Sequence, residues 1–102
     1  MILLKLPDVY EDAKIPLKGG FSLSLPEFVI LDSQGDPLAL DKAQATILTA
    51  LSLNAQVLDE DLTRLSKSYP SSICQLRKVL SKYNIKIHRL RRRGYECKWK
   101  AA

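Results

Sequence analysis

Few side chains in this 102-residue chain could act as nucleophiles, bases or metal ligands. It contains two cysteines, Cys74 and Cys97, which do not form a CxxC pair, and one histidine, His88, within a basic stretch. A disulfide framework or a zinc site needs more such residues at closer spacing, so two buried or half-buried reduced thiols are expected. The sequence also has no nucleophile–base pair and no phosphate-cradling glycine loop. It therefore predicts no catalytic residue, no metal site, no cofactor and no enzymatic activity.

Ionic side chains are divided unevenly along the chain. Residues 1–61 carry four lysines against ten acids, a net charge of −6, whereas residues 62–102 carry twelve basic residues against one acid, Glu96, a net charge of +11. Such an imbalance places a strong positive field at one end of the molecule, where polyanions are the natural partners. Nucleic acid is the leading candidate and an anionic membrane surface a distant second. Charge alone does not separate DNA from RNA.

The basic part begins with a segment that has the periodicity of an amphipathic helix. Apolar residues at helical spacing predict a helix over 71–83. Pro70 precedes two serines, Ser71 and Ser72, that are expected to cap its start, and Asn84 is expected to end it because asparagine tolerates the left-handed conformation. An ordinary amphipathic helix with a solvated basic face is the alternative interpretation. The residues predicted to face the core are Ile73, Leu76, Leu80 and Tyr83.

The remaining patterns predict the elements around this helix. Asp41 and Gln44 have the spacing of a capping box for a helix up to about Leu53, and three acids at 59–61 favour the start of a second helix. After Asn84 the period changes to two, which predicts two strands joined by a tight basic turn at 89–94. Within the first 40 residues, strands are predicted at 2–6, 15–17, 21–25, 27–32 and 38–40, with a turn at 33–37.

The order of these elements predicts an α+β fold in a single domain, residues 1–102. It comprises a small antiparallel sheet (1–40), a three-helix core that contains a helix-turn-helix (41–84) and a C-terminal hairpin (85–100). Three helices followed by a hairpin with a basic tip form the layout of a winged helix-turn-helix. In that layout the third helix enters the major groove of DNA and the hairpin, or wing, reaches an adjacent minor groove.

Three segments resemble the DNA-binding domain of OmpR/PhoB-type response regulators, and the resemblance covers almost the whole chain. Ile73-Cys-Gln-Leu-Arg-Lys-Val-Leu80 is similar to the family's recognition-helix pattern, and Leu90-Arg-Arg-Arg-Gly-Tyr95 to its wing signature. Gly35 to Leu40, followed by Asp41, is similar to the family's strand before the first helix. A four-stranded N-terminal sheet is implied as well.

The resemblance implies DNA-contact roles. Gln75 aligns with a base-reading position, and a glutamine amide can bond N6 and N7 of adenine. Arg91 aligns with a wing arginine that reaches into the minor groove, and Arg77 with an arginine that serves phosphate contact or helix packing. The other predicted contacts to bases or phosphates are Ser71, Ser72, Cys74, Lys78, Lys82, Arg89, Arg92 and Arg93.

Three departures from the family shape the expectation. The chain starts at Met1 without a receiver domain, so control by phosphorylation is not implied. The loop at 66–70 is very short, although in the family it helps to contact RNA polymerase, which favours a repressor or accessory role. Arg92 stands where the family often has a glycine, which predicts a more electrostatic wing.

We therefore expect a cytoplasmic, sequence-preferring double-stranded DNA-binding protein, a transcription regulator of bacterial, phage or plasmid type. The sequence contains no apolar run long enough to span a bilayer and no signal peptide. The alternative is a winged-helix interaction module that docks on a host regulator or RNA polymerase through its acidic half, with weak or no DNA binding. Binding as a monomer, a tandem pair or a symmetric dimer is left open.

Overall fold

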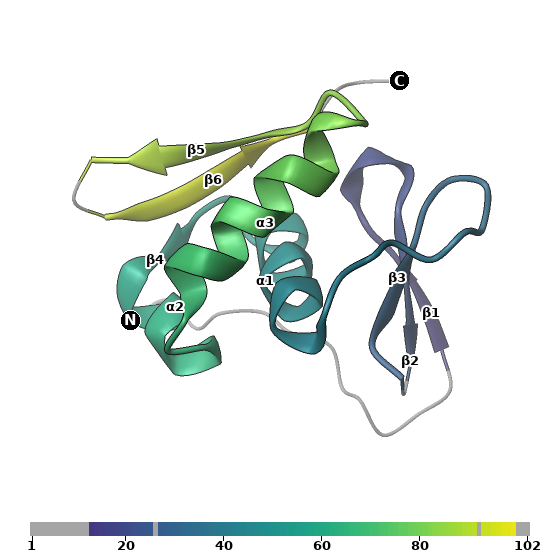
Figure 1. Cartoon of the computed structure of the whole chain (residues 1–102), viewed down its shortest axis with the longest axis horizontal. Coiled ribbons are helices and arrows are strands. Elements are labelled where there is room, and N and C mark those ends of the chain that lie inside the picture. The colour runs from purple at the N-terminus through teal and green to yellow at the C-terminus, as the bar shows by residue number, and fades with distance from the viewer. Residues whose placement is uncertain (1–12, 26, 92, 100–102) are drawn as a thin grey trace.

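The computed structural model describes residues 13–25, 27–91 and 93–99 and shows an α+β fold (Figure 1). The described residues form three α-helices, α1 (Lys42–Leu53), α2 (Asp59–Leu65) and α3 (Tyr69–Ser81), and a short 3-10 turn, η1 (Lys18–Gly20). They also form two small antiparallel sheets. The first contains β1 (Ala13–Pro16), β2 (Ser22–Leu25) and β3 (Val29–Leu31), and the second contains β4 (Val57–Leu58), β5 (Lys86–Leu90) and β6 (Gly94–Lys98).

The first sheet has the strand order β1-β2-β3, and its residues alternate as the sequence predicts. Leu23 and Leu25 are buried, whereas the serines between them are partly exposed. The strand predicted at 27–32 is shorter because Phe28 has a left-handed backbone, with φ of 61°, so that β3 begins after it. The strand predicted at 2–6, and with it the implied four-stranded sheet, falls outside the described residues.

The predicted strand at 38–40 is wrong. Only an isolated bridge joins Leu31 to Pro37, made by bonds from Leu38 N–H to the Ile30 carbonyl and from Asp32 N–H to the Asp36 carbonyl, each at 2.8 Å. The ladder does not continue, because the Leu38 carbonyl accepts from Leu40 N–H at 2.8 Å in a tight turn. The segment therefore crosses to α1 as a loop.

The helix starts differ in how well the sequence predicts them. The capping box of α1 is confirmed, because Asp41 Oδ1 accepts from Gln44 N–H at 2.8 Å and Gln44 Oε1 accepts from Asp41 N–H at 3.1 Å. In contrast, α3 begins at Tyr69, two residues earlier than predicted, with proline in its first turn. Ser71 and Ser72 lie inside the helix, so the prediction that they cap it is wrong.

The end of α3 is set by a tight turn into β5. The helix ends at Ser81, and Asn84 adopts the predicted left-handed conformation with φ of 59°. Its N–H donates to the Ser81 carbonyl at 3.2 Å, and the N–H of Ile85 donates to the Leu80 carbonyl at the same distance. At the other end of α3, only residues 66–68 separate it from α2.

The second sheet has the order β4-β6-β5, so the two-residue strand β4 pairs with the returning arm of the β5–β6 hairpin. Val57 is opposite Tyr95, and Leu58 is opposite Gly94. A Cβ atom at Gly94 would overlap the Val57 carbonyl oxygen and lie 2.7 Å from Leu58 Cα. Only glycine permits this approach, which ties the base of the hairpin tip to the start of α2.

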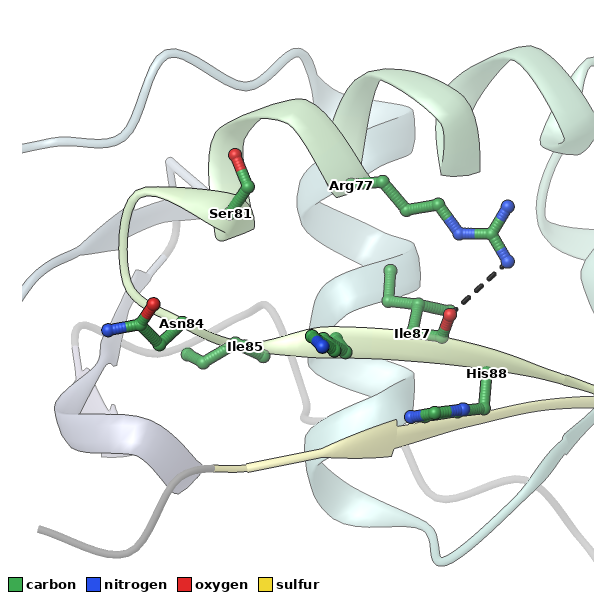
Figure 2. A pocket seen from close by; sticks show the side chains of 7 residues that line it. Arg77, Ser81, Asn84, Ile85, Ile87 and His88 are labelled. Carbon is green, nitrogen blue, oxygen red and sulfur yellow. Dashed lines mark hydrogen bonds between the residues drawn. The ribbon is translucent and has the colours of Figure 1, made fainter.

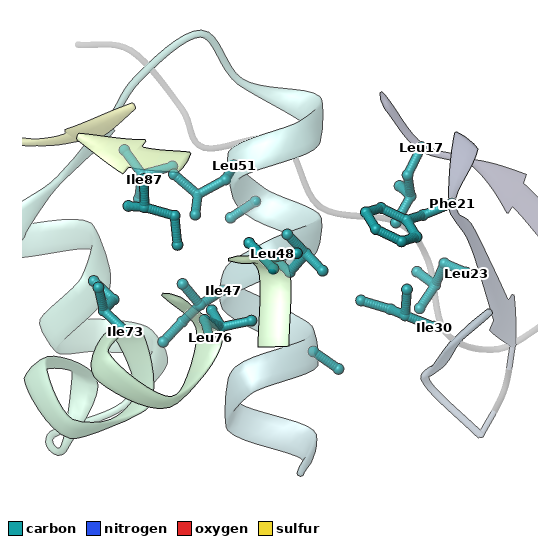
Figure 3. Close-up of a cluster of buried hydrophobic side chains, with 14 of the residues drawn as sticks. Leu17, Phe21, Leu23, Ile30, Ile47, Leu48, Leu51, Ile73, Leu76 and Ile87 are labelled. Atoms are coloured by element: carbon teal, nitrogen blue, oxygen red, sulfur yellow. The ribbon is translucent and has the colours of Figure 1, made fainter. Parts of the chain in front are cut away.

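One cluster of buried side chains joins both sheets to the helices (Figure 3). Its centre is α1, with Ile47, Leu48 and Leu51 almost fully buried. Burial of each such side chain stabilises the fold by about 1.5–3 kcal/mol. Around α1 lie Ile73, Leu76 and Ile87 on one side and Leu17, Phe21, Leu23 and Ile30 on the other.

None of the helices in the described part of the chain is long and apolar enough to cross a membrane.

Aromatic rings link the first sheet to the end of α3. The ring of Phe21 stands edge-on to those of Tyr83, at 5.2 Å, and Trp99, at 6.3 Å between centroids. The Lys18 N–H also donates to Ser52 Oγ at 2.8 Å. These contacts hold the first sheet against the side of the molecule opposite the hairpin tip (Figure 1).

Candidate nucleic-acid interface

The helix α3 has a buried face and a polar face, as the sequence predicts. Ile73, Leu76 and Leu80 are at most 1% exposed and fix the helix on the core. With 3.6 residues per turn, the opposite face brings together residues three or four positions apart. These exposed residues are Ser71, Cys74, Gln75, Lys78 and, one position past the helix end, Lys82. Five predicted contact residues therefore share one exposed face, which we call the α3 face.

Ser72 does not belong to this face. It is 7% exposed and lies on the side of α3 that packs on the core. A side chain in that position cannot reach a ligand that approaches the α3 face. We therefore remove Ser72 from the candidate contacts, and its small size is explained by helix packing.

Arg77 lies on the flank of α3 next to the hairpin (Figure 2). Its Nη2 donates to the carbonyl oxygen of Ile87 on β5 at 3.2 Å, and its guanidinium carbon lies 5.9 Å from the centre of the Tyr95 ring. The resemblance implies either phosphate contact or helix packing for Arg77, and these two contacts support the packing role. An arginine has five N–H donors, so this bond leaves others for a further partner.

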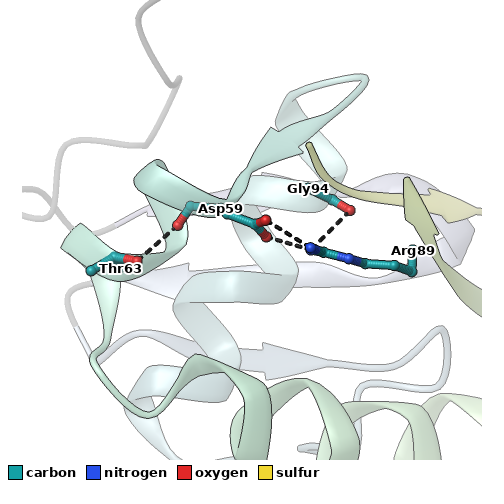
Figure 4. Close-up of polar contacts among 4 residues, drawn as sticks. All are labelled: Asp59, Thr63, Arg89 and Gly94. Atoms are coloured by element: carbon teal, nitrogen blue, oxygen red, sulfur yellow. Dashed lines mark hydrogen bonds and ion pairs between the residues drawn. The ribbon is translucent and has the colours of Figure 1, made fainter. Parts of the chain in front are cut away.

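Arg89 is held by a carboxylate, an arrangement that the sequence does not predict. Its Nη2 lies 2.8 Å from Asp59 Oδ2, its Nη1 makes a second short contact to Oδ1, and Gly94 O lies at 3.5 Å (Figure 4). The guanidinium group also lies 4.9 Å from the centre of the Tyr95 ring. The hydrogen bond to Asp59 raises the pKa of Arg89. Such paired, planar geometry makes Arg89 a brace between α2 and the hairpin.

The tip of the hairpin presents two further arginines. Arg91 and Arg93 are exposed in the turn between β5 and β6, whereas Arg92 lies outside the described residues. The backbone of the turn is fixed, since Arg93 O accepts from Asp59 N–H at 2.8 Å and Arg93 N–H donates to Leu90 O at 3.2 Å. The two side chains therefore project from a braced support.

A groove of about 310 Å³ separates α3 from β5 (Figure 2). On the β5 side, Lys86 and His88 are exposed, whereas the intervening Ile87 is 6% exposed. The sequence predicts these residues only as the outward members of a strand. The sequence pattern that could have predicted this site is a pair of basic residues, Lys86 and His88, separated by one apolar residue and placed directly after the predicted recognition helix. The residues that line the groove are Arg77, Ser81, Asn84, Ile85, Lys86, Ile87 and His88.

The two thiols differ in environment. Cys97 on β6 is partly buried, as expected, whereas Cys74 is exposed on the α3 face, so the expectation of a buried or half-buried thiol is wrong for Cys74. Burial raises the pKa of the Cys97 thiol to about 12, despite a smaller opposing effect from Lys18. Among the described residues, no group of three or more histidine, cysteine or carboxylate side chains is placed to hold a metal ion.

Comparison of the chain with protein-family models, with curated proteins and with solved structures gives no match. The acid in the basic part, Glu96, forms an ion pair with Lys98 at 3.2 Å. Its charge is therefore compensated within the hairpin.

Proposed function

We propose that this chain is a sequence-preferring double-stranded DNA-binding protein of the winged helix-turn-helix class that acts in transcription regulation. In this proposal α2 and α3, separated by residues 66–68, form the helix-turn-helix, and the β5–β6 hairpin is the wing. The observation that carries the proposal is the α3 face, where Gln75 is surrounded by Ser71, Lys78 and Lys82 on a helix without an acidic residue.

Gln75 is the proposed reader of sequence. It is exposed near the middle of α3, and the helix is anchored beneath it by Ile73 and Leu76. The major groove of B-DNA admits an α-helix, and a glutamine amide can pair with the N6 and N7 atoms of adenine. Such a bidentate contact contributes about 1–3 kcal/mol of discrimination against the wrong base.

Affinity in this proposal comes mainly from positive charge. Lys78 and Lys82 flank the reader, and Arg91 and Arg93 extend from the hairpin tip. Arginine is attracted to narrow minor grooves, and lysine and arginine release counterions when they contact phosphates. Each contact of this kind makes the affinity more sensitive to salt.

The proposal is tested by fluorescence polarisation with a labelled duplex of mixed sequence at low salt, followed by selection of a preferred site from a random duplex pool. Wild-type protein is expected to bind and to lose affinity steeply as salt rises. Gln75→Ala and Arg91→Ala are expected to weaken binding to the selected site. Lys42→Ala, which removes an exposed charge from the first turn of α1, serves as the control.

The absence of duplex binding at low salt would contradict the proposal. Cellular function retained by the Gln75→Ala/Arg91→Ala variant would instead favour the interaction module, with the N-terminal sheet as the contact surface.

A further inference from the structure

Cationic side chains border the groove between α3 and β5. Arg77 lines it from α3, and Lys86 and His88 border it from the outward face of β5, because they alternate with the buried Ile87. None of the described residues that line the groove carries a carboxylate. The cross-strand partner of Lys86 is Lys98, whose charge is paired with that of Glu96, the cross-strand partner of His88. A ligand of this groove should therefore carry negative charge.

The backbone of β5 contributes to the same site. β5 is an outer strand of its sheet, and the edge away from β6 faces α3, since Arg77 on α3 donates to the Ile87 carbonyl. In an antiparallel pair, the N–H and C=O of one residue point to the same side. The N–H of Ile87 therefore also points towards the groove, as a donor suited to an anion.

A peptide strand added to this edge is the less favoured occupant. Strand addition needs free backbone carbonyls as well as N–H groups, but Arg77 already occupies the Ile87 carbonyl. A lysine on an outer strand, here Lys86, is also a known device against edge pairing. The edge consequently offers donors and positive charge rather than a complete ladder.

The groove is continuous with the α3 face. Arg77 precedes Lys78 in the helix, and Ser81 lies three positions after Lys78 and precedes Lys82, so the groove borders the side of the face next to the hairpin. A helix in the major groove has a sugar–phosphate strand on either side of it. The strand on the hairpin side would run along this groove.

We propose that the groove between α3 and β5 seats the phosphodiester backbone of one DNA strand, with Lys86 and His88 as phosphate contacts that the sequence does not reveal. This inference rests on the proposed function, because the ligand is the duplex that α3 reads. It adds phosphate contacts on the side of α3 next to β5 to the contacts expected from the hairpin tip.

The test is a salt titration of binding, measured by polarisation with a fluorescein-labelled duplex of mixed sequence. The variant Lys86→Gln/His88→Gln is expected to reduce the slope of log K against log salt by about 1 to 2, which corresponds to the loss of one or two phosphate contacts. Lys42→Gln is the control, since Lys42 is exposed in the first turn of α1 and does not line the groove. It is expected to keep the wild-type slope. All three altered side chains are exposed, and thermal melts verify that each variant is folded.

Two results would overturn the proposal, and they are distinguishable. If the wild type binds duplex but Lys86→Gln/His88→Gln retains its slope, the groove does not hold the backbone, although the proposed function stands. That result is the one expected if an acidic peptide occupies the groove instead. If the wild type fails to bind duplex at low salt, both the proposed function and the proposed phosphate contacts in the groove are contradicted.

Discussion

The guanidinium group of Arg89 on β5 lies against the carboxylate of Asp59, the first residue of α2, with Nη2 and Oδ2 2.8 Å apart (Figure 4). A backbone bond from Asp59 N–H to Arg93 O runs beside it. One residue thus holds the hairpin by both its side chain and its main chain. The angle between the hairpin and the helices is consequently set by this joint as well as by the core.

This joint predicts different roles for two neighbouring arginines. Arg91→Gln should reduce the salt slope of duplex binding by about 1, because its exposed side chain is free to contact a phosphate or the minor groove. Arg89→Gln should leave the slope nearly unchanged, since its guanidinium is occupied by Asp59, but should lower the melting temperature. Salt titrations and thermal melts of both variants check this. A larger loss of slope for Arg89→Gln than for Arg91→Gln would show that DNA displaces Asp59.

Gln75 and Lys78 should separate specificity from affinity. Gln75→Ala should reduce the preference for the selected site over a single-base variant at the contacted position by about 1–3 kcal/mol. Lys78→Gln should weaken binding to both duplexes equally and reduce the salt slope by about 1. Competition binding with the paired duplexes measures both effects. Equal weakening of both duplexes by Gln75→Ala would remove Gln75 as the reader.

Gly94 should be the least replaceable glycine of the hairpin region. Gly94→Ala forces a Cβ against the Val57 carbonyl and to 2.7 Å from Leu58 Cα, so β4 or β6 must shift at a cost of about 1–3 kcal/mol or more. Gly35→Ala is the control, because it meets no atom within 4 Å and bears only the strain of its φ of 85°, about 1 kcal/mol. Urea unfolding midpoints compare the two. Equal decreases in the urea midpoint of the two variants would mean that a Cβ atom at position 94 fits between β4 and β6.

Cys97 predicts a decline of stability at high pH. Folding raises its pKa from 9.0 to about 12, so above pH 9 the unfolded chain loses a proton that the folded chain retains. The stability associated with the neutral thiol is therefore complete below pH 9 and is lost as the pH rises towards 12. Its slope should stay below the one-proton limit of about 1.4 kcal/mol per pH unit, since the side chain is partly exposed. Cys97→Ala should show a shallower decline in urea midpoint, and identical curves would contradict the prediction.

Local signals in the sequence predict much of the fold because their causes are local. The capping box needs only Asp41 and Gln44, and the left-handed turn needs only Asn84. The start of α3 is harder, because Ser71 and Ser72 resemble caps although the helix begins two residues earlier at Tyr69. The strand predicted at 38–40 also fails locally, where a bond from Leu40 N–H to the Leu38 carbonyl turns the chain out of the ladder.

The candidate site could be predicted only where one helix carries it. Helical spacing suffices to place Cys74, Gln75 and Lys78 on one face, but it does not reveal that Ser72 is buried on the other. The pair of Asp59 and Arg89 spans 30 positions in sequence, so its geometry depends on how the hairpin folds back onto α2. The groove beside β5 likewise exists only once α3 and the hairpin are packed together.

The central claim, that the α3 face lies against DNA, is tested most directly by the alkylation rate of Cys74. This exposed thiol sits beside Gln75, and the other cysteine, Cys97, should react slowly because burial raises its pKa to about 12. The rate with N-ethylmaleimide is measured by mass spectrometry with and without saturating selected duplex. Strong protection of Cys74, on the order of tenfold or more, is the predicted result. An unchanged rate at duplex concentrations that saturate binding would contradict the account, because the bound DNA would then leave the α3 face open.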